Sequence, residues 1–151
     1  MIKIIAVGYL KEQYLKQALE EYKKRISKYT NIEIIEIKDE GFVEEEKAKA
    51  KEKEKILKHI SEKDYIITLE IEGKEYNSLE FAEKLRKTQI ENSNLVFIIG
   101  GSYGLSSEIK KLSKMHLSFS KMTFPHQLFR ILLLEQIYRS YKINNNESYH
   151  K

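Results

Sequence analysis

The sequence predicts an α/β fold, a mainly parallel sheet with helices on both faces. Short apolar runs rich in β-branched residues alternate with longer segments whose apolar residues recur at helical spacing, which is typical of strand–helix–strand units. The chain has 151 residues and no Gly-, Pro- or Ser-rich linker. A chain of this length can bury about 70% of its unfolded surface in one core. We therefore expect a single domain spanning residues 1–151.

The first three elements follow from these patterns. Ile2–Val7 is a compact apolar run that ends at Gly8, which predicts a buried strand. Lys11–Ser27 has apolar residues at helical spacing and predicts a helix. Ile32–Ile37 is short and rich in isoleucine, so it predicts a second strand.

The fourth element is a highly charged helix candidate over Val43–Ile60. Its thin apolar stripe consists of Val43, Ala50, Leu57 and Ile60. Charges of both signs are mixed along it, as in Glu54 and Lys58 four residues apart, and this is typical of an exposed helix. A nucleic-acid-binding patch is the alternative, but the alternating signs favour a solvated face.

The middle of the chain contributes two more strands and a helix. Tyr65–Ile71 predicts the third strand, and Gly73 is expected to turn the chain. Ser78 is a plausible N-cap for a helix that ends near Lys87. Leu95–Gly100 is the most apolar strand candidate and predicts the fourth strand.

The last third begins with a short helix near Ser107–Leu112 and a weaker strand over Met115–Ser120. A long helix follows over Pro125–Tyr141, because the only proline of the chain suits the first turn of a helix. The tail over 144–151 is polar and Asn-rich, so we expect it to be mobile when no ligand is bound.

The last helix is apolar around most of its circumference. Its apolar residues are Leu128, Phe129, Ile131, Leu132, Leu133, Leu134, Ile137, Tyr138 and Tyr141. A helix that lies on one sheet needs a single apolar stripe, so this helix needs a second partner. We favour a homodimer interface over a helix covered within one chain.

Composition excludes several classes of site. The absence of cysteine rules out disulfides, thiol nucleophiles and thiolate zinc sites. The four histidines have no H-E-x-x-H spacing, so no metal is expected. No apolar run reaches about 18 residues, so no membrane span is expected, and we expect a soluble cytoplasmic protein. The net charge of +4 mildly favours a polyanionic partner such as nucleic acid.

Three loops mark the expected site, because ligands of open α/β sheets bind beyond the carboxyl ends of the strands. They follow Leu69, Ile99 and Ser118. The second loop, GGSYG over Gly100–Gly104, either lets a ligand approach the backbone or forms a tight turn with positive φ. These residues alone leave both alternatives open.

The same five residues also match G-x-S-x-G, with Ser102 at the nucleophile position of a serine hydrolase. His126 or His150 would then be the base. The acid would come from Glu108, Glu135 or Glu147. No HGGG-like segment for an oxyanion hole precedes this motif, so the hydrolase is the less favoured alternative.

Longer motifs carry a more specific signal. The segments FIIGGSYGLS (Phe97–Ser106), LSFSKMTFPHQLFRILLLEQIYRSYKI (Leu117–Ile143) and the terminal YHK (Tyr149–Lys151) closely resemble the SPOUT-class ribosomal RNA large subunit methyltransferases. The resemblance covers essentially the whole chain, beginning with MIKIIAVG. One departure is Tyr9, where the family is expected to have lysine.

The resemblance implies a homodimer with a deep C-terminal trefoil knot in roughly residues 95–143. It implies S-adenosyl-L-methionine as methyl donor, and N3 of a pseudouridine in 23S rRNA of the assembled ribosome as acceptor. The cofactor contacts carried over by motif are Leu69, Gly100, Phe119, Ser120, Lys121, Met122, Thr123 and Phe124. The stretch KMTF would then be the wall of a pocket.

The resemblance also suggests that the terminal tail completes the site of the partner subunit. We hypothesise that Arg139 and Lys151 contact phosphates and that Tyr149 and His150 contact the target base. The N3–H of the base must lose its proton, and His126 and His150 are candidates for the general base because an unperturbed imidazole titrates near ~6.5.

Overall fold

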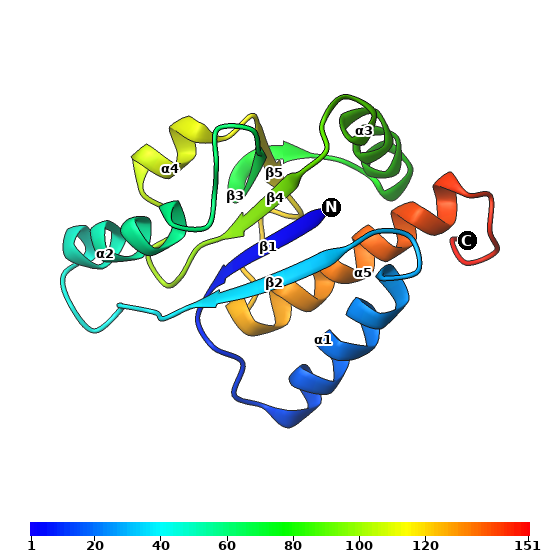
Figure 1. Cartoon of the computed structure of the whole chain (residues 1–151). Coiled ribbons are helices and arrows are strands. Elements are labelled where there is room, and N and C mark those ends of the chain that lie inside the picture. Colours follow the sequence, from blue (N-terminus) through cyan, green and yellow to red (C-terminus); the bar gives the residue numbers. More distant parts are fainter.

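A computed structural model describes all 151 residues and shows a five-stranded sheet in the order β2-β1-β4-β3-β5 (Figure 1). Every pair of neighbouring strands is parallel, which confirms the predicted α/β class. The strands are β1 (Ile2–Val7), β2 (Ile32–Ile37), β3 (Tyr65–Glu75), β4 (Leu95–Ile99) and β5 (Met115–Ser118). The helices are α1 (Gln13–Ile26), α2 (Glu45–Leu57), α3 (Ser78–Glu91), α4 (Ser107–Leu112) and α5 (His126–Asn144).

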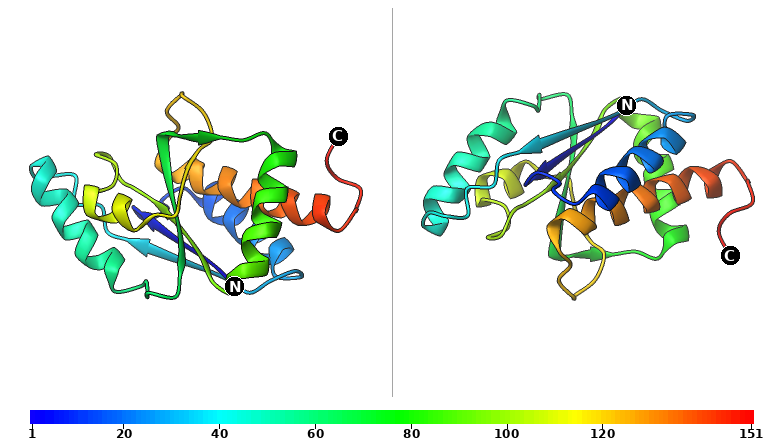
Figure 2. Two further views of the ribbon diagram at one scale, coloured as in Figure 1. Left: turned by 90° about the horizontal axis from the view of Figure 1, so that it is seen from above. Right: turned by 90° about the horizontal axis from the view of Figure 1, so that it is seen from below.

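Helices cover both faces of the sheet (Figure 2). Side chains of a strand point alternately to its two faces, and β1 shows the consequence. Ile2, Ile4 and Ala6 belong to a core with buried residues of α1, α3 and α5. Ile5 and Val7 belong to a second core with buried residues of α2 and α4.

The apolar circumference of α5 is covered within the chain, contrary to the reasoning from the sequence. The helix lies against α1 and α3 and contributes buried residues to the larger core. The apolar sides of α5 are therefore covered by α1, α3 and the sheet, although we expected a second chain to cover part of them. Leu128 stays 38% exposed, but the circumference of α5 by itself does not require a dimer.

Strand β3 is longer than predicted, and Gly73 lies inside it rather than in a turn. Leu117 of β5 is paired with both Leu69 and Lys74, so the residues between them form a bulge. A Cβ atom at Gly73 would lie 2.7 Å from the carbonyl oxygen of His116. Glycine is thus required here by the close approach of β5, a tertiary contact that local pattern does not reveal.

The predicted cap of α3 was wrong by one residue. Asn77 is the N-cap: its Oδ1 accepts from the Glu80 amide at 2.8 Å, and Glu80 Oε1 accepts from the Asn77 amide at 2.9 Å. This reciprocal pair is a capping box. Ser78 instead donates from Oγ to Gln136 Oε1 at 2.9 Å, which ties α3 to α5.

The predicted stripe of α2 was also wrong. The buried residues of this helix are Ala48, Glu52 and Ile56, whereas Ala50 and Leu57 are exposed. Glu52 was missed because it is charged. Its Oε2 accepts from the Glu40 amide at 2.9 Å, which satisfies one of its buried oxygens.

The remaining differences concern the ends of elements. β5 stops at Ser118, two residues before its predicted end, and α5 continues to Asn144 with Pro125 at its N-cap. α3 runs four residues beyond Lys87, to Glu91. None of the helices has the length and apolar character needed to cross a membrane.

Candidate active site

The three predicted loops meet at one cleft with a volume of about 420 Å³. The bulge of β3 contributes Leu69–Glu72, and the loop between β4 and α4 contributes Gly100–Leu105. The loop between β5 and α5 forms the third wall and includes Ser118, Phe119, Ser120, Met122, Thr123 and Phe124. All of the residues predicted to contact the cofactor except Lys121 therefore line this cleft.

The GGSYG loop is both a tight turn and a wall of the cleft. The Gly104 amide donates to the Gly101 carbonyl oxygen at 3.0 Å, and Gly104 has a φ of +79°. A Cβ atom at Gly100 would lie 2.8 Å from the carbonyl carbon of Gly104. The two alternatives left open by the sequence are thus compatible, since the turn itself forms the surface.

The loop between β5 and α5 presents free backbone groups to the cleft. Its internal hydrogen bonds run from the Met122 amide to Ser120 Oγ at 3.0 Å and from Ser118 Oγ to the Ser120 carbonyl oxygen at 3.1 Å. The amides of Lys121, Thr123 and Phe124 donate no hydrogen bond within the chain. These groups are available to a ligand, because unpaired backbone donors in a cleft seek partners.

Aromatic rings give the same loop its shape. Phe129 of α5 packs against Phe119 and Phe124, with ring centroids 5.1 Å and 5.8 Å away. Met122 is 74% exposed at the edge of the cleft. The stretch KMTF is therefore part of a pocket wall, and its phenylalanine is anchored to the first turn of α5.

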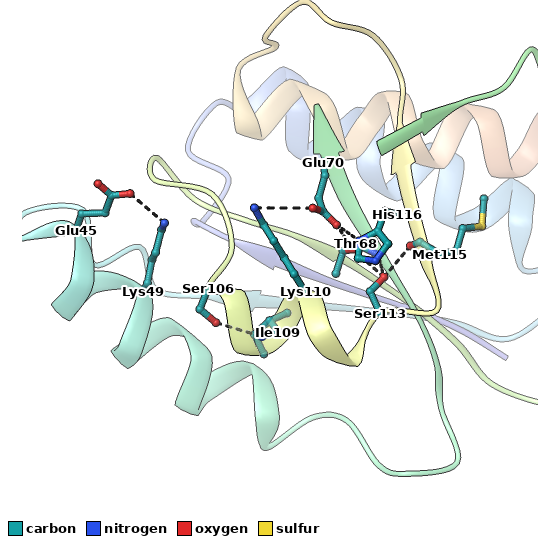
Figure 3. Close-up of polar contacts among 10 residues, drawn as sticks. All are labelled: Glu45, Lys49, Thr68, Glu70, Ser106, Ile109, Lys110, Ser113, Met115 and His116. Atoms are coloured by element: carbon teal, nitrogen blue, oxygen red, sulfur yellow. Dashed lines mark hydrogen bonds and ion pairs between the residues drawn. The ribbon is translucent and has the colours of Figure 1, made fainter. Parts of the chain in front are cut away.

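A polar cluster at the cleft was missed by the sequence reasoning (Figure 3). Glu70 Oε2 accepts from Thr68 Oγ1 at 2.6 Å and contacts His116 Nδ1. Glu70 Oε1 lies 3.8 Å from Lys110 Nζ. Partial burial raises the pKa of the Glu70 carboxyl, but the contacts with Thr68, His116 and Lys110 outweigh it and hold this pKa below its usual value. No motif signals the cluster, because its members come from β3, α4 and β5.

The four predicted catalytic residues do not gather at one place in the chain. His126 lines the cleft at the start of α5. Arg139, Tyr149 and His150 form a separate cluster near the end of the same helix. Arg139 Nη1 and His150 Nδ1 are 3.1 Å apart, and the Arg139 guanidinium lies 4.7 Å from the centroid of the Tyr149 ring.

The distance between the two groups follows from helix geometry. Arg139 is 13 residues beyond His126 in one helix, and a rise of 1.5 Å per residue separates them by roughly 20 Å. Figure 2 shows the C-terminus beside the far end of α5. One chain therefore does not bring all four residues to the same ligand.

The tail makes contacts with its own chain. The Tyr149 ring packs edge-on against Tyr138 with centroids 5.0 Å apart. Glu147 accepts hydrogen bonds from the Tyr29 hydroxyl at 2.8 Å and from Lys142 Nζ at 2.9 Å. The mobility of residues 144–151 stays a prediction, and these are the contacts that movement of the tail would have to break.

The geometry does not support the hydrolase alternative. Ser102 Oγ donates to Asp39 Oδ2 at 3.4 Å and has no histidine partner. Glu135 is paired with Arg139, and Glu147 with Lys142. A nucleophile needs a base within hydrogen-bond reach, and Ser102 lacks one. No group of three or more His, Asp or Glu side chains is placed to hold a metal ion.

Comparisons with known proteins identify the family of this chain. A sequence model of the family described as "Predicted SPOUT methyltransferase" matches residues 1–150. The chain is 52% identical over 154 residues to the ribosomal RNA large subunit methyltransferase H of Caldicellulosiruptor saccharolyticus, with 100% of both chains covered. It is 52% identical over 157 residues to the protein of the same name from Clostridium tetani, with 99% of each covered.

Solved structures show the same fold. The structure described as "a probable methylase family protein from Haemophilus influenzae Rd KW20" matches with a TM-score of 0.58 and 15% sequence identity, over 99% of this chain and 70% of that chain. At this identity the likeness concerns the fold alone.

Proposed function

This chain belongs to the SPOUT methyltransferase family, and on that premise we propose that it transfers a methyl group from S-adenosyl-L-methionine to N3 of a pseudouridine in 23S rRNA. Its full-length relatives are named as methyltransferases of large-subunit ribosomal RNA, which supports RNA as the substrate class. The observation that carries the proposal is the cleft where three strand-end loops meet. The choice of pseudouridine N3 rests on the family resemblance.

The residues of the cleft fit such a donor. A volume of about 420 Å³ lies in the range of about 300–1,000 Å³ that is usual for small-molecule sites. Leu69, Phe119 and Phe124 supply apolar surface, and the amides of the β5–α5 loop can read the polar edge of an adenine. S-adenosyl-L-methionine would supply a methyl group bound to a sulfonium, so that the acceptor bonds to the methyl carbon while the carbon–sulfur bond breaks and the thioether leaves.

The chain has two tasks in this reaction. The first is to hold the acceptor nitrogen close to the methyl group and aligned with it, which mainly reduces the entropic part of the barrier. The second is to remove the N3 proton of the base. His126 lies at the cleft and His150 lies in the tail cluster, and both remain candidates for the base.

The separation of these residues supports a homodimer. In one chain Arg139 and the tail lie roughly 20 Å along α5 from His126, too far to contact the same base. A second copy can bring its Arg139, Tyr149 and His150 to this cleft. We therefore retain the homodimer, with the tail of each chain completing the other's site, and the trefoil knot over residues 95–143 that the family implies.

The substrate is expected to be rRNA in the assembled ribosome, in the cytoplasm. With a net charge of +4, one chain is expected to bind free RNA only weakly through electrostatic attraction. A methylated base must also be taken out of its stack, which is easier in an RNA loop than in a duplex. A dimer that docks on a folded ribosomal surface meets both requirements.

The test uses purified protein, radiolabelled S-adenosyl-L-methionine and ribosomes from a strain that lacks this methylation. Label is expected at a single pseudouridine of 23S rRNA. Fully modified ribosomes from the wild-type strain are the matched control and should take up no label. Cofactor binding without label would point to another acceptor, and the absence of both would refute the methyltransferase.

A further inference from the structure

One corner of the cleft brings a lysine and a carboxylate together. Lys110 reaches in from α4, and Glu70 reaches in from the bulge of β3 (Figure 3). No other lysine or arginine lines the cleft, and its remaining acidic or basic side chains are Glu72 and His126. A ligand with a negatively charged group therefore finds one lysine ammonium in this cleft, that of Lys110.

Glu70 is held in one orientation by its own chain. Thr68 Oγ1 donates to Glu70 Oε2 at 2.6 Å, and His116 contacts the same oxygen. Thr68 is itself fully buried and shares a hydrogen bond of 2.8 Å with Ser113 Oγ. The Glu70 side chain is only 13% exposed, whereas Glu72 is exposed. Glu70 thus enters the cleft preorganised, which lowers the entropic cost of binding a ligand.

The other oxygen of Glu70 and the ammonium of Lys110 form an ion pair without a hydrogen bond between them. The nearest donor to Glu70 Oε1 is Lys110 Nζ at 3.8 Å, which is beyond hydrogen-bond range. Lys110 Nζ has no acceptor in range either. The depressed pKa of Glu70, which follows from Thr68, His116 and Lys110 outweighing its burial, keeps the carboxylate ionised at neutral pH.

An α-amino acid complements this pair. Its ammonium donates to a carboxylate and its carboxylate accepts from an ammonium, and both groups stand on one carbon. We propose that Glu70 and Lys110 form the subsite for the α-amino-acid end of the methyl donor, with Glu70 Oε1 accepting from the α-ammonium and Lys110 Nζ binding the α-carboxylate. This inference rests on the proposed function. The adenosine then occupies the apolar remainder of the cleft.

The test is calorimetric titration of the full-length protein with three ligands. S-adenosyl-L-homocysteine keeps the amino-acid end without the sulfonium, S-adenosyl-L-methionine has both, and 5′-methylthioadenosine has neither. Glu70→Gln and Lys110→Met should each weaken both amino-acid ligands by about tenfold, as expected for the loss of one charge-assisted hydrogen bond. Binding of 5′-methylthioadenosine should stay within about twofold, and this also shows that each variant is folded.

Matched controls remove the same charges nearby. Glu75→Gln alters an exposed carboxylate of the same strand that does not line the cleft, and Lys111→Met alters an exposed lysine of the same helix. Both should leave binding of S-adenosyl-L-homocysteine within about twofold. An effect of Glu75→Gln as large as that of Glu70→Gln would overturn the assignment.

The outcomes separate this inference from the proposed function. An equal loss for all three ligands would mean that Glu70 only supports the β3 bulge. A loss confined to S-adenosyl-L-methionine would assign Glu70 to the sulfonium and overturn its pairing with the ammonium. If the unaltered protein binds all three ligands and neither variant weakens any, the subsite alone is refuted. If the unaltered protein binds none, the proposed function falls as well.

Discussion

Arg130 donates from Nη1 to Glu36 Oε2 at 2.9 Å and thereby joins the first turns of α5 to strand β2. The guanidinium also donates to the Gly8 carbonyl oxygen at 2.9 Å. Burial lowers the pKa of Arg130, and Glu36 counteracts this. Because α5 starts at the loop that forms one wall of the cleft, this pair fixes the position of that wall.

The two partners should differ in how much their loss costs. The Arg130 side chain is 1% exposed and that of Glu36 is 33% exposed. Glu36→Ala leaves a buried charge without its partner and should lower the free energy of unfolding by about 3–5 kcal/mol. Arg130→Met should cost less, about 1–3 kcal/mol, because Glu36 can return to water. Urea denaturation gives both values, and the reverse order would contradict the explanation.

Gly100 and Gly104 of the GGSYG loop should also differ in the effect of their replacement by alanine. At Gly100 a Cβ atom would meet the Gly104 carbonyl carbon at 2.8 Å, so Gly100→Ala must displace the loop. We expect methyl transfer to fall by about 100-fold, the loss typical of a displacement of about 1 Å. Gly104→Ala meets open space and strains only a positive φ, at about 1–2 kcal/mol of stability. Initial rates and thermal unfolding of both variants test this contrast.

Glu52 predicts a pH-dependent stability. Burial raises the pKa of this carboxyl, and Asp39 and Glu40 raise it further, against the hydrogen bond from the Glu40 amide. Between the ordinary carboxyl pKa near ~4.3 and the raised folded-state value, the folded protein binds more protons than the unfolded chain. The contribution of Glu52 to the free energy of unfolding therefore falls as the pH rises through this window.

Glu52→Gln removes this contribution. The stability of the variant relative to the unaltered protein should increase as the pH is raised from about 4 to about 8. The exposed Glu54 of the same helix provides the control, since Glu54→Gln makes the same substitution at a side chain that lies in water. Urea denaturation at several pH values measures both. A difference for Glu52→Gln that shrinks with rising pH would contradict this account.

Local pattern predicted the fold better than it predicted the site. Three elements have the same bounds in the structure as in the prediction: Ile2–Val7, Ile32–Ile37 and Ser107–Leu112. Their bounds depend on residues that are close in sequence, so local pattern is enough to predict them. Glu52 was left out of the buried stripe because it is charged. Gly73 was predicted to turn the chain, whereas it is required by the close approach of β5. The cleft was placed by the rule for strand ends, but Glu70 and His116 meet only through the pairing of β3 with β5.

Ser102 separates the two enzyme classes. Ser102→Ala removes one hydrogen bond to Asp39 of 3.4 Å and should leave methyl transfer within about fivefold of the unaltered protein, since such a bond contributes about 1 kcal/mol. A serine hydrolase would lose its nucleophile. Methylation of ribosomes and hydrolysis of a chromogenic ester, measured on the same preparations, distinguish the two. Ester hydrolysis that disappears with Ser102→Ala would restore the hydrolase alternative.

The tail should be needed for methyl transfer but not for binding the donor. Tyr149 and His150 contact Arg139 at the end of α5, far from the cleft of the same chain. Deletion of residues 149–151 should therefore abolish methylation and leave binding of S-adenosyl-L-homocysteine unchanged. Activity that survives the deletion would refute a role of the tail in catalysis.

Mixing two inactive variants tests whether the tail acts across a dimer. One variant lacks residues 149–151, and the other carries Gly100→Ala with an intact tail. In a mixed dimer one site combines an intact cleft with the intact tail of its partner, while the other site has neither. Random exchange of subunits in a two-fold dimer should restore about a quarter of the original activity. If each tail served the cleft of its own chain, no site in the mixture would be complete and methylation would stay at the residual level of the two variants.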